Sequence, residues 1–171
     1  MKTAVSFLIV CGLCAWADAQ QTTTLTAADR LKQLQSNRKL VEKLVGHGVS
    51  LANANEPLKR AGHCRSAMGE LTLALDGAIR EQDASRVAEL GEHLAAIVND
   101  GLIPNLKEAK PNATPASPAF AEFIALHTSS TDELQRLQSS VPQLEALGRS
   151  AQVKAMLANL SKTNEALAKA K

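Results

Sequence analysis

The side chains with the widest chemical repertoire in this chain are its histidines, one cysteine and the carboxylates near them. After residue 19 the sequence contains none of the His-x-x-x-His, Cys-x-x-Cys or His-Glu-x-x-His spacings that bind metal from one element. A ligand set would therefore have to come from different helices, as it does in many bundles. The candidates for such a metal site are His47, His63, Glu89, His93 and His127.

Two neighbouring pairs show how these residues would be placed on helices. Glu89 and His93 are four residues apart and share one side of a helix, but that side lies about 100° or more from the apolar stripe and is expected to face solvent. His63 and Cys64 are consecutive, so their side chains diverge by about 100°. Cys64 falls about 20° from Leu71 on the apolar stripe, which predicts a buried core thiol instead of a nucleophile or ligand.

Sequence motifs for catalysis are missing as well. The chain has no Gly-x-Ser-x-Gly nucleophile elbow and no glycine-rich phosphate loop. We therefore infer no catalytic residue, no cofactor and no small-molecule substrate, and we predict that the protein is not an enzyme.

Charge and aromatic content narrow the class of partner. The formal net charge is +2, and basic and acidic residues are interspersed, so no strong field attracts nucleic acid or an anionic membrane. Beyond residue 19 the only aromatic side chains besides histidine are Phe120 and Phe123. Bases need aromatic stacking platforms, so a nucleic-acid partner is not expected.

The first 19 residues have the three-part order of a secretory signal peptide. A basic start at Lys2 precedes an apolar run, 4–15, and small residues before a cleavage point after Ala19. The apolar run is shorter than the roughly 20 residues of a spanning helix, so no stable membrane span is expected. Cleavage predicts an exported product, periplasmic or extracellular, whose single cysteine could form a disulfide only with another molecule.

After a flexible leader at 20–25, residues 26–171 are expected to form an all-α helical domain, because apolar residues recur at helical steps and no strand pattern appears. Residues 26–109 should hold three helices, with Pro57 opening the second, Asp83 or Ser85 capping the third, and Asn99-Asp100-Gly101 ending it. A resumed helix over 102–110, around Pro104, is left open. The apolar face of the first helix is expected to consist of Ala27, Leu31, Leu34, Val41, Val45, Val49 and Ala52, with Leu44 beside them.

A proline-rich linker, 110–118, separates this part from a C-terminal helical hairpin at 119–171. Ser117 is expected to cap the fourth helix. Ser139-Ser140-Val141-Pro142 either kinks that helix or separates it from a fifth, and we favour a fifth helix with Pro142 in its first turn. Short links between helices make antiparallel neighbours, so the fold class predicted is a bundle of four to five amphipathic helices built from antiparallel hairpins. Few large apolar residues follow the linker, so this hairpin should pack more loosely and serve as the docking part.

Two segments resemble parts of exported all-helical proteins of planctomycete-type bacteria. They are Glu56-Pro57-Leu58-Lys59-Arg60-Ala61-Gly62-His63-Cys64 and Arg86-Val87-Ala88-Glu89-Leu90-Gly91-Glu92-His93-Leu94, and the resemblance covers about residues 38–108. It implies a periplasmic or extracellular helical module and brings no functional residues with it. Arg60 and Cys64 lie four residues apart and so share one side of a helix. Buried packing along that side explains the shared sequence as well as a functional site does.

The leading hypothesis for function is therefore an exported, non-enzymatic interaction or structural module of the cell envelope, whose helices meet a protein partner or a second copy of the chain. Two alternatives remain open at the level of sequence. One is an envelope metal-binding or metal-sensing protein whose histidines converge on folding. The other is a carrier of an apolar ligand, held in an aliphatic core that opens at a proline hinge.

Overall fold

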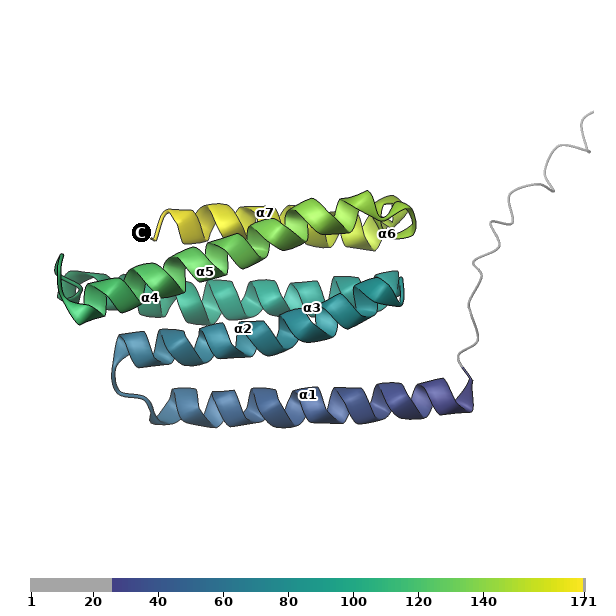
Figure 1. Ribbon diagram of the computed structural model, residues 1–171, viewed down its shortest axis with the longest axis horizontal. Coiled ribbons are helices and arrows are strands. Elements are labelled where there is room, and N and C mark those ends of the chain that lie inside the picture. The colour runs from purple at the N-terminus through teal and green to yellow at the C-terminus, as the bar shows by residue number, and fades with distance from the viewer. Residues whose placement is uncertain (1–25, 171) are drawn as a thin grey trace, which may run out of the picture. The chain divides into compact units, whose positions relative to one another are not determined.

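Figure 1 shows a computed structural model of the chain, which divides into two compact units, residues 1–34 and 35–171. The structure describes residues 26–170. The predicted signal peptide, 1–19, and the predicted leader, 20–25, lie outside the described residues. Each unit is described by itself below, and the first contributes only the beginning of one helix.

Every regular element in the described part of the chain is helical, so the predicted all-α class is confirmed. Unit 2 contains the end of the first helix and all the others. In chain order the elements are α1 (Ala27–Asn53), α2 (Pro57–Arg80), α3 (Ala84–Ala96), the π-helical segment η1 (Ile97–Leu102), α4 (Ile103–Ala109), the 3-10 turn η2 (Lys110–Asn112), α5 (Pro118–Ser140), the 3-10 turn η3 (Val141–Gln143), α6 (Glu145–Arg149) and α7 (Ala151–Ala168).

Helix starts follow the capping chemistry of the sequence. Pro57 is the first residue of α2, and the Asp83 carboxylate accepts a hydrogen bond from the Arg86 backbone N–H at 3.0 Å to cap α3. The Ser117 hydroxyl accepts from the Phe120 N–H at 3.1 Å and caps α5. These three predicted starts are confirmed.

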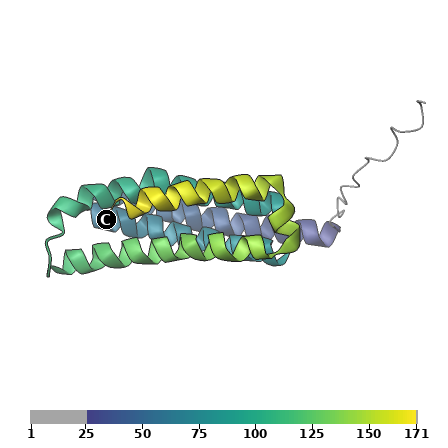
Figure 2. The same cartoon turned by 90° about the horizontal axis from the view of Figure 1, so that it is seen from above.

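The core of unit 2 lies between α2, the continuous α3–η1–α4 segment, α5 and α7, which run alongside one another in Figures 1 and 2. Full burial of one large aliphatic side chain stabilises a fold by about 1.5–3 kcal/mol, so these residues supply most of its stability. The largest fully buried side chains are Met68, Leu71, Leu75, Leu94, Leu102, Leu106, Leu134, Leu137, Leu147, Met156, Leu160 and Leu167.

The third helix does not end at Asn99-Asp100-Gly101, and that prediction is wrong. The chain continues through η1 into α4, where the Ile103 N–H bonds to the Val98 carbonyl, five residues back. Pro104 lacks an N–H and its ring would clash with the carbonyl four residues before it, at Asp100. The wider π turn takes up one extra residue and lets the helix pass this proline.

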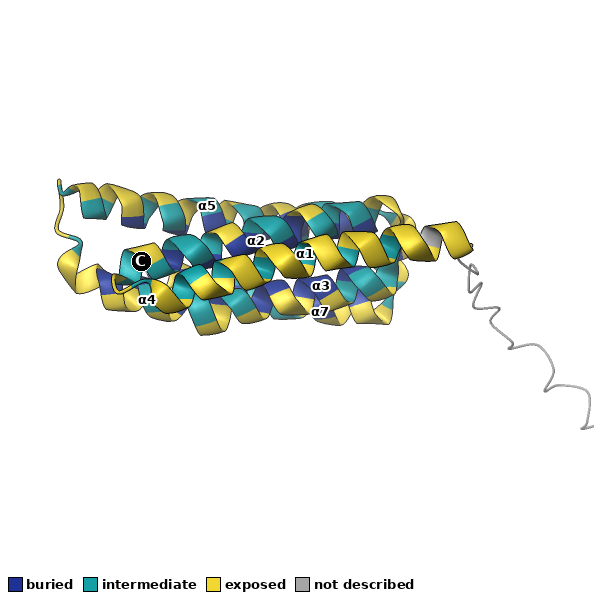
Figure 3. Ribbon diagram, turned by 90° about the horizontal axis from the view of Figure 1, so that it is seen from below, coloured by how far each residue is buried: buried dark blue, intermediate teal, exposed yellow. Residues whose placement is uncertain are grey.

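The C-terminal helices are also not the loosely packed part. Phe123, Leu134 and Leu137 of α5 and Val153 and Leu160 of α7 are all buried. Among the α-helices, α1 alone has no buried residue among those described, and its described residues are yellow and teal in Figure 3. A few well-spaced leucines in α5 and α7 fill the core because α5 packs against both α2 and α7, and α7 packs against both α3 and α5. The part of α1 in unit 2 packs on the core only through half-buried leucines.

Candidate functional site

The five predicted metal-ligand candidates are divided among four helices. His47 lies on α1, His63 on α2, and Glu89 and His93 are exposed on α3. His127 lies buried on α5. Among residues 26–170, no group of three or more histidine, cysteine or acidic side chains is arranged to hold a metal ion.

His127 joins two helices of the core. Its side chain is 6% exposed, and its Nε2–H donates a hydrogen bond to the Leu167 carbonyl oxygen at 3.0 Å. The ring also stacks on Phe123, with ring centroids 6.5 Å apart. Because one ring nitrogen is engaged by a backbone carbonyl near the end of α7, this histidine has a structural role between α5 and α7.

His47 and His63, in contrast, meet at one cavity of about 420 Å³ in unit 2. The cavity lies between α1, α2 and the junction of α3 with η1, and its walls are mostly aliphatic. Its lining residues are Leu44, His47, Gly48 and Leu51 of α1, His63, Cys64 and Ala67 of α2, and Ala96, Ile97, Asp100 and Gly101 of the α3–η1 junction. Sequence reasoning missed Asp100 and Gly101, because both were assigned to a helix stop.

The inner wall of the cavity is formed by Cys64 against Gly101. Cys64 is 3% exposed, and a Cβ atom added to Gly101 would lie 2.8 Å from the Cys64 Sγ, so only glycine allows this approach. Burial raises the pKa of the Cys64 thiol above its ordinary value. The thiol therefore stays protonated at neutral pH and acts as an apolar wall, not as a nucleophile.

The π-helical segment η1, which forms one wall of the cavity, is held by a hydrogen bond from a residue of α4. The Asn105 side-chain amide donates to the Gly101 carbonyl at 2.8 Å, which satisfies one backbone acceptor of the π turn. The Arg60 guanidinium donates to the Asn105 side-chain oxygen at 2.6 Å and also pairs with Glu108. This network holds η1 in register against α2.

Helix α1 forms the outer wall and is attached by partly exposed contacts. Leu40, Leu44 and Leu51 pack against the core, the Lys43 Nζ pairs with Glu70 of α2 at 2.7 Å, and Arg86 of α3 donates to the Asn37 side chain. A surface ion pair contributes only about 0–1 kcal/mol. The outer wall is therefore the least firmly held side of the cavity.

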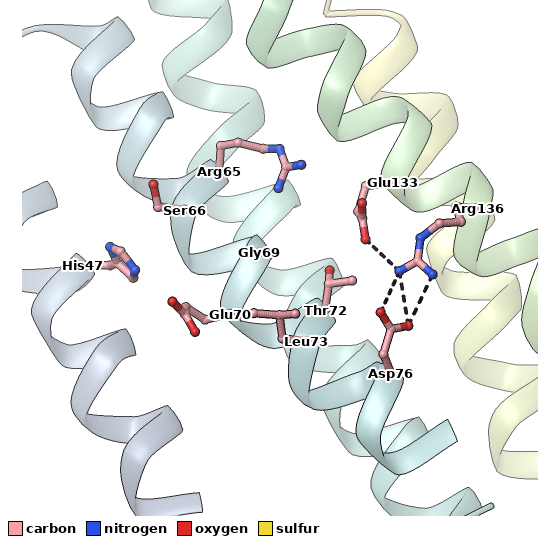
Figure 4. A pocket seen from close by; sticks show the side chains of 10 residues that line it. All are labelled: His47, Arg65, Ser66, Gly69, Glu70, Thr72, Leu73, Asp76, Glu133 and Arg136. Carbon is pink, nitrogen blue, oxygen red and sulfur yellow. Dashed lines mark hydrogen bonds and ion pairs between the residues drawn. The ribbon is translucent and has the colours of Figure 1, made fainter. Parts of the chain in front are cut away.

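A second hollow, a groove of about 640 Å³, runs along the outside of α2 and is drawn in Figure 4. Arg136 of α5 reaches across it, donating to Asp76 of α2 at 3.2 Å and to Glu133 at 2.9 Å. The hydrogen bond that Arg136 donates to the Glu133 carboxylate is the main reason that the pKa of Arg136 is raised. The hydroxyl of Thr72, a groove residue that is 5% exposed, has no hydrogen-bond partner in the described part of the chain.

The charges of this groove are largely satisfied by one another. Arg136 binds two carboxylates, and Arg65 donates to the Ser129 hydroxyl at 3.2 Å. Such pairs clamp α2 to α5 and leave little capacity for a charged ligand. The groove is therefore a structural contact between helices and a weaker candidate for binding than the cavity.

The outer face of α1 in unit 2 is an exposed apolar stripe. Val41, Val45 and Val49 are spaced four residues apart and are 57%, 59% and 58% exposed. An exposed ion pair, Arg38 with Glu42 at 2.8 Å, lies beside them. The sequence predicted these valines to be the packing face, and this is wrong: the leucine stripe, whose side chains bury more apolar area, takes the side against the bundle.

The residues of unit 1 that carry the predicted stripe, Leu31 and Leu34, are exposed as well. Within the described part of the chain, no helix combines the length and the apolar character needed to cross a membrane.

Fold and site together define an α-helical bundle protein whose first helix, α1, has two apolar faces: one lines a cavity and the other is exposed. Neither a protein-family model, nor a curated protein, nor a solved structure matches this chain.

Proposed function

We propose that this protein is a non-enzymatic helical interaction module, exported to the cell envelope, that associates with a second copy of itself through the outer face of α1. The observation that carries the proposal is the stripe of three valines, each more than half exposed on a helix whose other apolar face already packs on the bundle. Covering a valine side chain fully is worth about 1.5–3 kcal/mol, so leaving three in water is costly.

The spacing of the stripe favours another helix as its partner. Val41, Val45 and Val49 form an i, i+4, i+8 ridge. Ridges of this kind interdigitate best with the same kind of ridge on a facing helix, which is the commonest mode of helix packing. A second copy of α1 offers such a ridge.

The charged residues beside the valine stripe favour a second copy of the protein, and not an anionic membrane, as the partner of this face. Arg38 is paired with Glu42 on the same helix, so this part of the face has no net charge. Two copies can approach without repulsion, whereas binding to an anionic membrane depends on unpaired cations.

Sedimentation velocity over a range of concentrations tests the proposal. The full chain should shift from monomer to dimer as concentration rises, and Val45→Glu should remain monomeric because it places a charge in the middle of the stripe. Ser36→Glu is the matched control, since it adds the same charge at an exposed position of the same helix outside the stripe. A chain that stays monomeric at every concentration, or a Val45→Glu variant that dimerises normally, would contradict self-association.

Export is tested separately. Expression of the full chain in a bacterial host, followed by fractionation and mass spectrometry, should recover a product that begins at Gln20 in the periplasm or medium. An intact chain beginning at Met1 and retained in the cytoplasm would contradict the export part of the proposal and leave the dimerisation part unaffected.

A further inference from the structure

We propose that the cavity beneath α1 is a binding site for a single-chain aliphatic molecule with a cationic head group, an alkylammonium ion. The cavity, at about 420 Å³, lies within the roughly 300–1,000 Å³ typical of small-molecule sites. This site is independent of the outer face of α1 on which the dimer depends.

The apolar residues that line the cavity favour a ligand with an aliphatic alkyl chain. The large aliphatic side chains that line it are Leu44, Leu51 and Ile97, and Ala67 and Ala96 are smaller apolar lining residues. The only rings that line the cavity are the imidazoles of His47 and His63, and none of the lining residues is phenylalanine, tyrosine or tryptophan, so the apolar walls offer an aromatic ligand no large ring to stack on. A flexible alkyl chain fits walls made of small and branched side chains.

The polar residues that line the cavity favour a cationic head group on the ligand. Asp100 is the only acidic residue that lines the cavity, and no lysine or arginine lines it. Asp100 is exposed, and its carboxylate makes no hydrogen bond or ion pair with any other described residue. A carboxylate with no cationic partner favours a positively charged head and repels a fatty-acid carboxylate.

The imidazoles of His47 and His63 add hydrogen-bonding capacity at the same cavity. Neither side chain forms a hydrogen bond within the described part of the chain, and a neutral imidazole offers one acceptor nitrogen. An ammonium group has three donors, and the Asp100 carboxylate and the imidazole nitrogens are groups lining this cavity that can accept a hydrogen bond from it.

The π turn is what brings Asp100 to this position. Ile97, Asp100 and Gly101 all line the cavity from η1, and Gly101 has no side chain to obstruct it. Segments of π-helix occur often at functional sites, because the extra residue changes the direction of the side chains around it. Entry requires no disruption of the core, since α1 contributes no buried residue and is held by surface contacts.

Isothermal titration calorimetry of the full chain with decylammonium, decanol and decanoate, each below its micelle concentration, tests the proposal. We expect one decylammonium per chain and decanoate binding about tenfold or more weaker. Asp100→Asn should weaken decylammonium by about fivefold, as expected for one partly exposed ion pair, and leave decanol unchanged. Equal affinity for decanoate and decylammonium, or an Asp100→Asn variant that binds decylammonium normally, would overturn the assignment of the head group.

Two glycine variants test the location. No atom lies within 4 Å of a Cβ built on Gly48 or on Gly46, so either position accepts a side chain, but only Gly48 lines the cavity. Gly48→Leu should reduce decylammonium affinity by about tenfold or more, as expected when a binding cavity is filled, and Gly46→Leu should retain it. Normal binding by Gly48→Leu, or no binding by the unmodified chain, would overturn the site. The monomeric Val45→Glu variant should bind normally, which separates this result from the outcome of the dimerisation experiment.

Discussion

Gly101 of η1 lies directly against Cys64 of α2, so closely that a Cβ atom on Gly101 would be 2.8 Å from the Cys64 Sγ. This contact sets the distance between the π-helical segment and α2, and it forms the inner wall of the cavity. The pair is separated by 37 positions in the sequence (101 − 64), and it explains why a helical segment contains a residue of poor helix propensity.

Gly101→Ala should destabilise the protein through this contact. Overpacking costs about 1–3 kcal/mol, and the better helix propensity of alanine returns about 1 kcal/mol, so a net loss on the order of 1 kcal/mol is expected. In a Cys64→Ala background the added methyl group has room, and the same substitution should become neutral or stabilising. Urea unfolding of the four proteins, followed by circular dichroism, measures this coupling. Equal losses in both backgrounds would show that the two residues do not interact.

Alkaline pH should destabilise the protein through Cys64. Burial raises the pKa of this thiol in the folded chain above its value in the unfolded chain. The folded state therefore holds the proton to higher pH, so the stabilisation is fully present below the ordinary thiol pKa of about 8.5 and is lost as pH rises above it. The unfolding free energy of the unmodified chain, compared with that of Cys64→Ala, should fall relative to the variant across this alkaline range. A constant difference between the two proteins would contradict a buried, protonated thiol.

Removing the His127 hydrogen bond should weaken the contact between α5 and α7. His127→Leu keeps apolar volume but removes one of the two hydrogen bonds to the Leu167 carbonyl, which still accepts from the Ala170 backbone N–H at 2.9 Å, so a loss of about 0.5–1.5 kcal/mol is expected. His127→Gln retains a donor and should lose less. Thermal unfolding of both variants tests the role of the donor, and a similar loss in both would indicate that ring packing on Phe123 matters more than the hydrogen bond.

Amide hydrogen exchange should be fastest in α1 among the long helices of unit 2. Residues 35–53 include no buried side chain, whereas Val153, Met156 and Leu160 anchor α7 in the core. Local opening of α1 breaks only surface contacts and therefore requires less free energy than global unfolding. Protection in α1 equal to that in α7 would mean that both helices open only with the whole bundle.

Gly46→Ala should stabilise α1 without altering its contacts. Gly46 is exposed, and a Cβ atom at this position meets nothing within 4 Å. Alanine is better than glycine in a helix interior by about 1 kcal/mol, so exchange of the α1 amides should slow by about fivefold. Unchanged exchange rates would show that α1 opens by detaching as an intact helix instead of by unwinding.

Short-range sequence patterns, namely helical periodicity, N-cap residues and prolines, were sufficient to predict the class of fold and most helix starts. The caps at Asp83 and Ser117 and the proline at the start of α2 act within a few residues of chain, so the sequence alone locates them. The place of Cys64 on the apolar stripe of its helix is a property of spacing of the same kind.

Short-range sequence patterns gave the wrong prediction where the composition of a segment and the apolar residues on either side of it favour different structures. Asn99-Asp100-Gly101 has the composition of a helix stop, yet the bundle continues the helix as a π turn because the apolar residues on both sides, Val98 and Leu102, are buried together. Packing of these side chains outweighs the poor propensity of the segment between them.

The sequence by itself therefore determined that this chain is helical, where most helices begin and which residues can enter a core. Only the tertiary structure decided which of the two apolar faces of α1 meets the bundle, because periodicity describes both faces equally well. It also decided that His47, His63 and Asp100 share one cavity while Glu89, His93 and His127 stay apart. Such groupings depend on distances between residues far apart in the chain, and these distances are set by how the whole core packs.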